Sequence, residues 1–107
     1  MPFRLFGKKR DGGEWTLQEK WAVFCKGQVA PGQDPNLIRA DACNMRIHWS
    51  LYGDTAPLGM GWEIDHIRPV SKGGTDDLWN LQPLQWQNNR QKGDDETWTC
   101  AVTWRAA

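Results

Sequence analysis

Four polar residues in the second half of the chain have the types and the spacing that metal-assisted hydrolysis requires. Asp65 and His66 are adjacent, Asn80 follows His66 by fourteen residues, and Asn89 follows nine residues later. A carboxylate can hold a cation, an imidazole can accept a proton from water near neutral pH, and a side-chain amide can complete the cation site. An Asp-His pair alone would say little, but the four residues together indicate a hydrolytic site that uses a metal ion.

Short motifs surround these residues. They are WEIDHI at 62–67, Pro69, SKGG at 71–74, NLQPL at 80–84, NR at 89–90 and KGD at 92–94. In order and spacing, this part of the chain resembles the HNH endonuclease family. The resemblance implies a ββα-metal fold, in which two antiparallel strands, the loop between them and a short helix surround one divalent ion.

The resemblance also implies a role for each of the four polar residues. It makes His66 the general base, Asp65 and Asn89 the metal ligands, and Asn80 the asparagine that braces the loop and the base. Asn80 has an alternative role as a plain turn residue. Asn88 is an alternative ligand if the helix begins one residue later, because adjacent helical residues point about 100° apart and only one can face the ion.

The cysteines depart from the pattern of many HNH relatives, which hold a structural zinc with two Cys-x-x-Cys pairs. Cys43 is followed by Arg46 where such a pair needs a second cysteine, and Gln85 and Asn88 stand where the other pair would lie. We therefore expect no structural zinc. The protein ligands expected for the catalytic ion are both oxygens, which favours Mg²⁺ or Mn²⁺ over Zn²⁺.

The elements that must position these residues predict a small α+β domain. A chain of 107 residues fits one domain, which we place at 15–107 after a flexible basic arm at 1–14. Its core motif at 62–94 should comprise a strand at 62–67, a return strand at 81–84, and a helix from 85 or 86 to 92 that Gly93 ends.

Further elements are predicted outside the core motif. Thr16 and Glu19 form a capping box that begins a helix, whose buried face should carry Leu17, Trp21 and Phe24 or Cys25. A short hairpin is expected from 38–43 and 45–52, with Asn44 in the turn. The period-two pattern at 98–104 predicts a C-terminal strand.

Strand geometry imposes a condition on the site. Neighbouring side chains of a regular strand point to opposite faces, so Asp65 and His66 cannot both reach one phosphate from an ideal strand. The backbone should therefore leave β geometry at or just after His66. Asn80 suits a residue that pins the irregular segment, because an amide donates and accepts hydrogen bonds at once.

The charge of the chain is balanced but unevenly placed. A formal net charge of zero argues against a strong non-specific DNA binder. Two basic clusters are nevertheless candidates for contacting nucleic acid, and the first should add electrostatic affinity but no chemistry. They are Arg4, Lys8, Lys9 and Arg10 in the arm, and Arg68, Lys72, Arg90 and Lys92 in the motif. Lys92 has an equal alternative as an exposed, solvated side chain.

Three unpaired cysteines favour a reducing compartment, and no segment is long and apolar enough for a membrane span. We expect a cytoplasmic protein of a bacterium or a phage-infected host.

We predict a metal-dependent endonuclease that acts on DNA, double-stranded DNA above all, and that nicks it as a monomer. The alternatives are a nucleic-acid-binding module without catalysis and a subunit of a larger nuclease or phage packaging complex. A weak dimer could form through exposed tryptophans, with Trp49, Trp79 and Trp104 as candidates.

Overall fold

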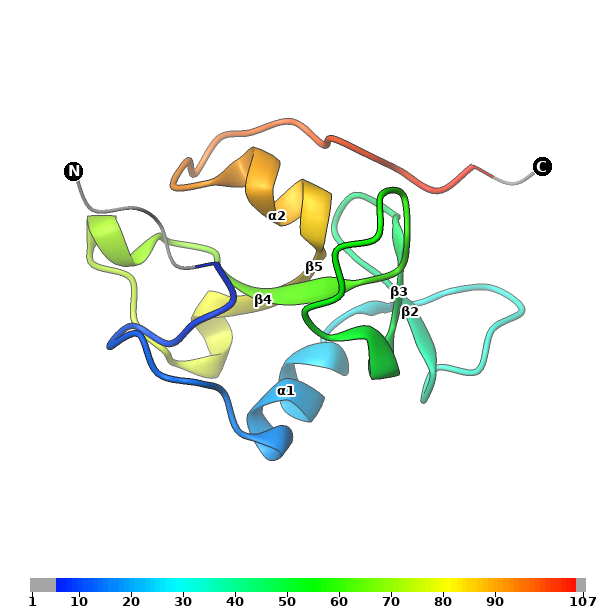
Figure 1. Ribbon diagram of the computed structural model, residues 1–107, viewed down its shortest axis with the longest axis horizontal. Helices are drawn as coiled ribbons and strands as arrows, with labels where there is room; N and C mark the ends of the chain where they lie inside the picture. Colours follow the sequence, from blue (N-terminus) through cyan, green and yellow to red (C-terminus); the bar gives the residue numbers. More distant parts are fainter. Residues whose placement is uncertain (1–5, 106–107) are drawn as a thin grey trace.

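An antiparallel hairpin of two five-residue strands, β4 (Trp62–His66) and β5 (Leu81–Gln85), forms the centre of the molecule (Figure 1). The computed structural model describes residues 6–105. The helix α2 (Trp86–Lys92) follows β5 directly and ends at Gly93. This arrangement confirms the predicted strand, loop, strand and helix, and it is consistent with a ββα-metal fold.

The two helices cover opposite faces of this hairpin (Figure 1). Side chains alternate along β4, so Glu63 and Asp65 contact α2, while Trp62 and Ile64 join the hydrophobic core with α1 (Leu17–Phe24). Tryptophan and phenylalanine rings dominate that core. The centroids of Phe24 and Trp62, for example, lie 5.4 Å apart. Burying such large rings compensates for the small size of the domain.

The capping box at the start of α1 is confirmed. The Thr16 hydroxyl accepts from the Glu19 amide, and the Glu19 carboxylate accepts from the Thr16 amide. The predicted buried face of the helix is wrong in part. Phe24 is fully buried, but Leu17 is 72% exposed and Trp21 is 37% exposed. Because α1 meets the core with its last turn, its first turn projects into solvent.

A second, three-stranded antiparallel sheet contains β1 (Gln28–Val29), β2 (Ile38–Ala40) and β3 (Arg46–His48). Its β2–β3 hairpin confirms the one predicted from the sequence, and Asn44 has the positive φ of 61° expected of its turn. The strands are shorter than predicted, because a 3-10 helix follows β3 at once and the His48 ring caps it.

The predicted C-terminal strand is wrong, since residues 94–105 contain no strand. The segment runs in an extended path over α2, drawn in orange and red in Figure 1. Asn88 accepts from the backbone amides of Ala101 and Val102, so a side chain takes the place of a neighbouring strand. An extended chain has the same period-two alternation whether or not it pairs with a strand.

Within the described part of the chain, no helix combines the length and apolar character that a membrane crossing needs.

Candidate active site

Asp65 lies in the middle of a buried polar cluster between β4 and α2. Its Oδ1 is 3.2 Å from the Lys92 ammonium, and its Oδ2 accepts from Gln82 Nε2 at 2.9 Å. Lys92 also donates to the main-chain oxygen of His66 and is only 1% exposed. The alternative of an exposed, solvated Lys92 is therefore wrong. Its charge is balanced inside the protein by Asp65, as a buried ammonium requires.

Asn89 lies on the same side of β4 as Asp65. Its Nδ2 donates to Glu63 Oε1 at 2.8 Å, whereas its Oδ1 is buried and has no hydrogen-bond partner among the described residues. A buried amide oxygen without a partner costs free energy and calls for an explanation. A cation ligand is such an explanation. The oxygen donors of Asn89 and Asp65 thus fit a hard divalent ion, with water or phosphate oxygens completing its shell.

Glu63 orients the Asn89 amide. One carboxylate oxygen accepts from Asn89, and the other accepts from Arg90 at 3.0 Å. Because a carboxylate only accepts, it fixes the amide nitrogen toward itself and turns Oδ1 away. If Asn89 is a metal ligand, Glu63 would orient it without contacting the ion.

His66 is the last residue of β4, so the backbone leaves β geometry where the sequence predicted. The imidazole Nε2 lies 2.7 Å from Asp76 Oδ1, and the ring centroid lies 5.9 Å from that of the buried Trp15. The His66 ring thus contacts the loop and the segment before α1, while the Asp65 carboxylate contacts α2 and β5. Asp76 was missed by the sequence analysis, because an aspartate in a polar loop has no distinctive spacing.

Asn80 braces the loop between β4 and β5. Its Oδ1 accepts from the Arg68 amide at 2.8 Å, and its Nδ2 donates to the main-chain oxygens of Arg68 and Thr75. The side chain is buried and ties the start of the loop to its end. These bonds tie the two ends of the loop together, as expected of a bracing asparagine, while a role of Asn80 toward the base stays a prediction.

Asn88, the alternative metal ligand, is hydrogen-bonded to Asp41 and to the C-terminal segment. Its Nδ2 donates to Asp41 Oδ2 and to the Val102 carbonyl, and its Oδ1 accepts two backbone amides. Asp41 also accepts from the main-chain nitrogens of Cys43, Met45 and Gln85. Burial raises the pKa of the Asp41 carboxyl, while these donors oppose the rise. All polar atoms of Asn88 are used, which leaves Asn89 as the candidate ligand.

Two of the positions where zinc-binding relatives are expected to have cysteines, Gln85 and Asn88, therefore meet at Asp41. Gln85 and Asn88 bind this carboxylate with hydrogen bonds, and Cys43 forms a disulfide with Cys100. The expectation of three unpaired cysteines was wrong for two of them. The partners are 57 residues apart in sequence, so no local spacing could reveal the pair. The inference of a reducing compartment loses its basis.

The basic residues of the arm lie in different environments. Arg4 is outside the described residues. Lys8 and Lys9 form ion pairs with Glu14 and Glu19, and the Lys8 ammonium holds the pKa of Glu14 below its ordinary value. The backbone amide of Arg10 donates to Asp76. Whether residues 1–14 are flexible stays a prediction.

Three of the motif's basic residues are at the surface and one is buried. Arg68 and Lys72 are exposed. Arg90 pairs with Glu63 and lies over the rings of Phe6 and Trp86. The Arg90 side chain is still 41% exposed, so Arg68, Lys72 and Arg90 are the accessible positive charges of the motif, whereas Lys92 is buried.

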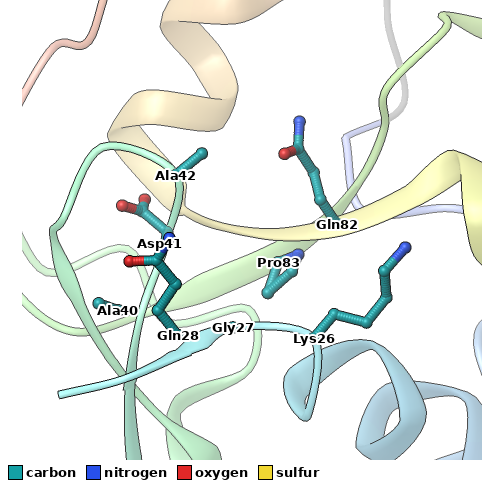
Figure 2. A pocket seen from close by; sticks show the side chains of 8 residues that line it. All are labelled: Lys26, Gly27, Gln28, Ala40, Asp41, Ala42, Gln82 and Pro83. Carbon is teal, nitrogen blue, oxygen red and sulfur yellow. The ribbon is translucent and has the colours of Figure 1, made fainter.

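A pocket of about 150 Å³ lies beneath β5, at the end of α1 and beside β1 and β2 (Figure 2). Its polar lining residues are Lys26, Gln28, Asp41 and Gln82, and burial lowers the pKa of Lys26. None of the predicted catalytic or metal-binding residues lines it. Gln82 alone connects the pocket to the cluster, through its hydrogen bond to Asp65.

The donor set of the candidate site is small. Among residues 6–105, no group of three or more histidine, cysteine, aspartate or glutamate side chains could hold a metal ion. A site built from one carboxylate and one amide leaves most coordination positions to water and phosphate, as Mg²⁺ sites in nucleic-acid enzymes do.

Comparison with known proteins identifies the family. The model for HNH endonucleases matches residues 42–95, half of the chain. This range contains β3, the β4–β5 hairpin, α2 and all four predicted site residues. Searches among curated proteins and among solved structures found no match. The order of the motifs, the ββα arrangement of the elements and the matched family show that this chain belongs to the HNH endonucleases.

Proposed function

We propose that this protein is a metal-dependent endonuclease that hydrolyses DNA phosphodiester bonds. His66 is the general base, and Asp65 and Asn89 hold one divalent cation, Mg²⁺ or Mn²⁺. The observation that carries the proposal is the buried, unpartnered Oδ1 of Asn89, which lies on the same side of β4 as Asp65. Family membership supports nuclease activity in general, and this oxygen supports a metal site within it.

The chemistry follows from the side chains. A water oxygen attacks phosphorus while a ring nitrogen of His66 takes its proton, and the bond from phosphorus to the leaving 3′-oxygen breaks. The bound cation supplies charge stabilisation at the phosphoryl and leaving oxygens. The leaving oxygen is protonated by solvent. Glu63 and Asn80 touch neither water nor phosphate in this scheme; they hold Asn89 and the loop in place.

A cleavage assay on supercoiled plasmid tests the proposal. The wild type should cleave with Mg²⁺ or Mn²⁺ and stop when EDTA is added. His66→Ala should lose roughly 10²–10⁴-fold in rate, because that is what a positioned base contributes. His48→Asn is the matched control, since asparagine can still cap the turn at Ser50. Cleavage by His66→Ala at the wild-type rate would refute the assignment.

One contact favours a second function, a nucleic-acid-binding module without catalysis. The Lys92 ammonium lies 3.2 Å from Asp65 Oδ1, where it competes with a divalent ion for the carboxylate. Under this alternative, Mn²⁺ would leave the melting temperature of the wild type unchanged, and Lys92→Met would gain a metal-induced shift. Under our proposal the wild type itself shows the shift.

The number of cuts per binding event follows from the number of sites. One metal site acts on one phosphodiester bond at a time, so a monomer should nick and open circles should accumulate before linear product. Concerted double-strand cleavage needs a second site from a dimer. Trp79 is 70% exposed and remains a candidate for a dimer contact, whereas Trp49 packs against the core. Linear product formed directly, by protein that sediments as a dimer, would contradict nicking by a monomer.

DNA contacts are proposed for the exposed basic residues. Each phosphate contact that a substitution removes should reduce the magnitude of the slope of log affinity against log salt by about one. Arg68→Ala and Lys72→Ala should both lower that slope. Replacing Lys8 and Lys9 should lower it further if these lysines exchange their ion pairs with Glu14 and Glu19 for DNA phosphates. A role as a subunit of a larger nuclease or packaging complex would appear as co-elution with that partner in size-exclusion chromatography.

A further inference from the structure

The imidazole of His66 has a carboxylate partner that the scheme above does not use. Its Nε2 lies 2.7 Å from Asp76 Oδ1, with the histidine side chain 9% exposed and the aspartate side chain 34% exposed. An ionised carboxylate can only accept, so the proton between the two groups belongs to Nε2. A neutral imidazole has one donor and one acceptor nitrogen. A donor role for Nε2 therefore makes Nδ1 the nitrogen that can accept a proton.

We propose that Asp76 is a positioning residue that holds His66 in the Nε2–H tautomer and leaves Nδ1 as the base. This inference rests on the proposed nuclease function, because it names the nitrogen of His66 that takes the proton from water. Asp76 itself touches neither water nor phosphate. It acts by selecting the tautomer and by fixing the rotation of the ring.

The backbone of the N-terminal segment holds Asp76 in turn. The Arg10 amide donates to Asp76 Oδ1 at 2.9 Å and is 3.3 Å from Oδ2. Two backbone hydrogen bonds close a turn around it, from Gly12 to Lys9 and from Lys9 to Gly13. The expectation that the arm adds affinity but no chemistry is therefore incomplete. One of its amides supports the partner of the base.

Two further contacts restrict the same unit. Asn80 Nδ2 donates to the main-chain oxygen of Thr75, the residue before Asp76, at 2.8 Å. The buried Trp15 ring lies beside the His66 ring, with centroids 5.9 Å apart. The carboxylate is thus fixed from three directions by the loop, the turn at Arg10 and the imidazole. Asn80 and Asp76 therefore belong to one hydrogen-bonded network.

Nuclear magnetic resonance can read the tautomer without cleavage or metal. The chain has two histidines, so a two-bond ¹⁵N–¹H spectrum contains two ring patterns, and it is recorded at a series of rising pH values until the patterns no longer change. The spectrum of His66→Ala identifies the pattern of His48. We expect His66 of the wild type to show the Nε2–H pattern and that of Asp76→Ala to shift toward a mixture of tautomers. An Nδ1–H pattern in the wild type, or an unchanged pattern in Asp76→Ala, would overturn the proposal.

Cleavage kinetics test the consequence. Asp76→Ala should lower kcat about 10- to 100-fold, the range for a residue that orients a functional group, with KM and the Mn²⁺-induced melting shift unchanged. Asp76→Asn retains an acceptor oxygen and should recover part of the rate. Asp77→Ala is the matched control, because Asp77 is exposed and, among residues 6–105, its carboxylate is hydrogen-bonded to Thr75 and not to His66. Equal rates for Asp76→Ala and Asp77→Ala would overturn the proposal.

A second pair of variants tests the backbone contact. Arg10→Pro removes the amide that donates to Asp76, whereas Arg10→Ala keeps that amide and removes only the charged side chain. The proline variant should lower kcat and the alanine variant should not. Equal kcat values would show that the turn at Arg10 does not hold Asp76. If no variant and no wild-type protein cleaves DNA, the proposed function fails, while the tautomer spectra still decide whether Asp76 positions His66.

Discussion

Asn88 and Asn89 are neighbours on α2, both are fully buried, and they differ in how many of their polar atoms have partners. Asn88 makes four hydrogen bonds, to Asp41 and to the C-terminal segment. Asn89 makes one that is identified, to Glu63, and its Oδ1 has none. Native proteins satisfy nearly all buried polar atoms, so a buried amide oxygen without a partner calls for an explanation. One side of α2 thus stabilises the fold, and the other keeps an oxygen available.

The Asn88 side also joins segments that are far apart in the sequence. The Asn88 side joins α2 to the β2–β3 hairpin through the Asp41 carboxylate, and the Cys43–Cys100 disulfide joins the same hairpin to the C-terminal segment. The comparison predicts that changes on the two sides of α2 will affect different properties.

The largest effect is expected from Asn89→Ala. Loss of the ligand should remove the cation's contribution to the transition state, several kcal/mol, and lower the cleavage rate on the order of 10³-fold. The melting shift produced by Mn²⁺ should disappear with it. Asn88→Ala is the control, measured at a temperature where it remains folded. A rate for Asn89→Ala close to that of the wild type would remove the distinction between the two sides.

Asn88→Ala should instead lower stability. Four hydrogen bonds are lost, each worth about 1 kcal/mol net, so the free energy of unfolding should fall by about 4 kcal/mol. Urea denaturation followed by tryptophan fluorescence would measure it. The folded fraction should still bind Mn²⁺. A small loss of stability with a large loss of metal binding would reverse the assignment of the two asparagines.

Removing the disulfide should lower the stability of the fold and leave the candidate metal site unchanged. Replacing Cys43 and Cys100 by alanine removes a link across 57 residues, and we expect a loss of about 3 kcal/mol in the free energy of unfolding. The Cys25→Ala variant is the control, because Cys25 is the free cysteine of the described chain. Cleavage per folded molecule should stay unchanged at low temperature. If reduction abolished cleavage while the protein remained folded, the two sides would be coupled.

The smallest effect concerns pH. Because burial raises the pKa of Asp41 above its ordinary value of 3.8, the folded protein binds this proton more tightly than the unfolded chain. Its contribution to stability is therefore fully present below that value and is lost as pH rises through the raised folded pKa. The ¹³C shift of the Asp41 carboxyl, followed against pH, reports the midpoint directly. A midpoint at or below 3.8 would show that the four donors outweigh burial.

Local patterns in the sequence predicted the elements that carry the site. The alternation around Asp65, the polar loop and the glycine at 93 were enough to place β4, β5 and α2 to within a residue or two. The capping box at Thr16 and the turn at Asn44 were equally local, since each depends on residues within one turn of chain. Predictions that used only periodicity did less well. Leu17 is exposed, and residues 98–104 form no strand, because periodicity does not reveal the partner against which a segment packs.

The sequence by itself determined the ββα segment and the four candidate residues, whose types and spacing are properties of the chain alone. The tertiary structure decided what surrounds them. It brought Lys92 into an ion pair with Asp65 and joined Cys43 to Cys100 by a disulfide. It also formed the hydrogen bonds between Asp76 and His66 and between Glu63 and Asn89. Most of these contacts join residues more than ten positions apart. Their formation depends on how β4, α2, the loop and the terminal segments pack, and that packing is set by burial of the whole core and by no short motif.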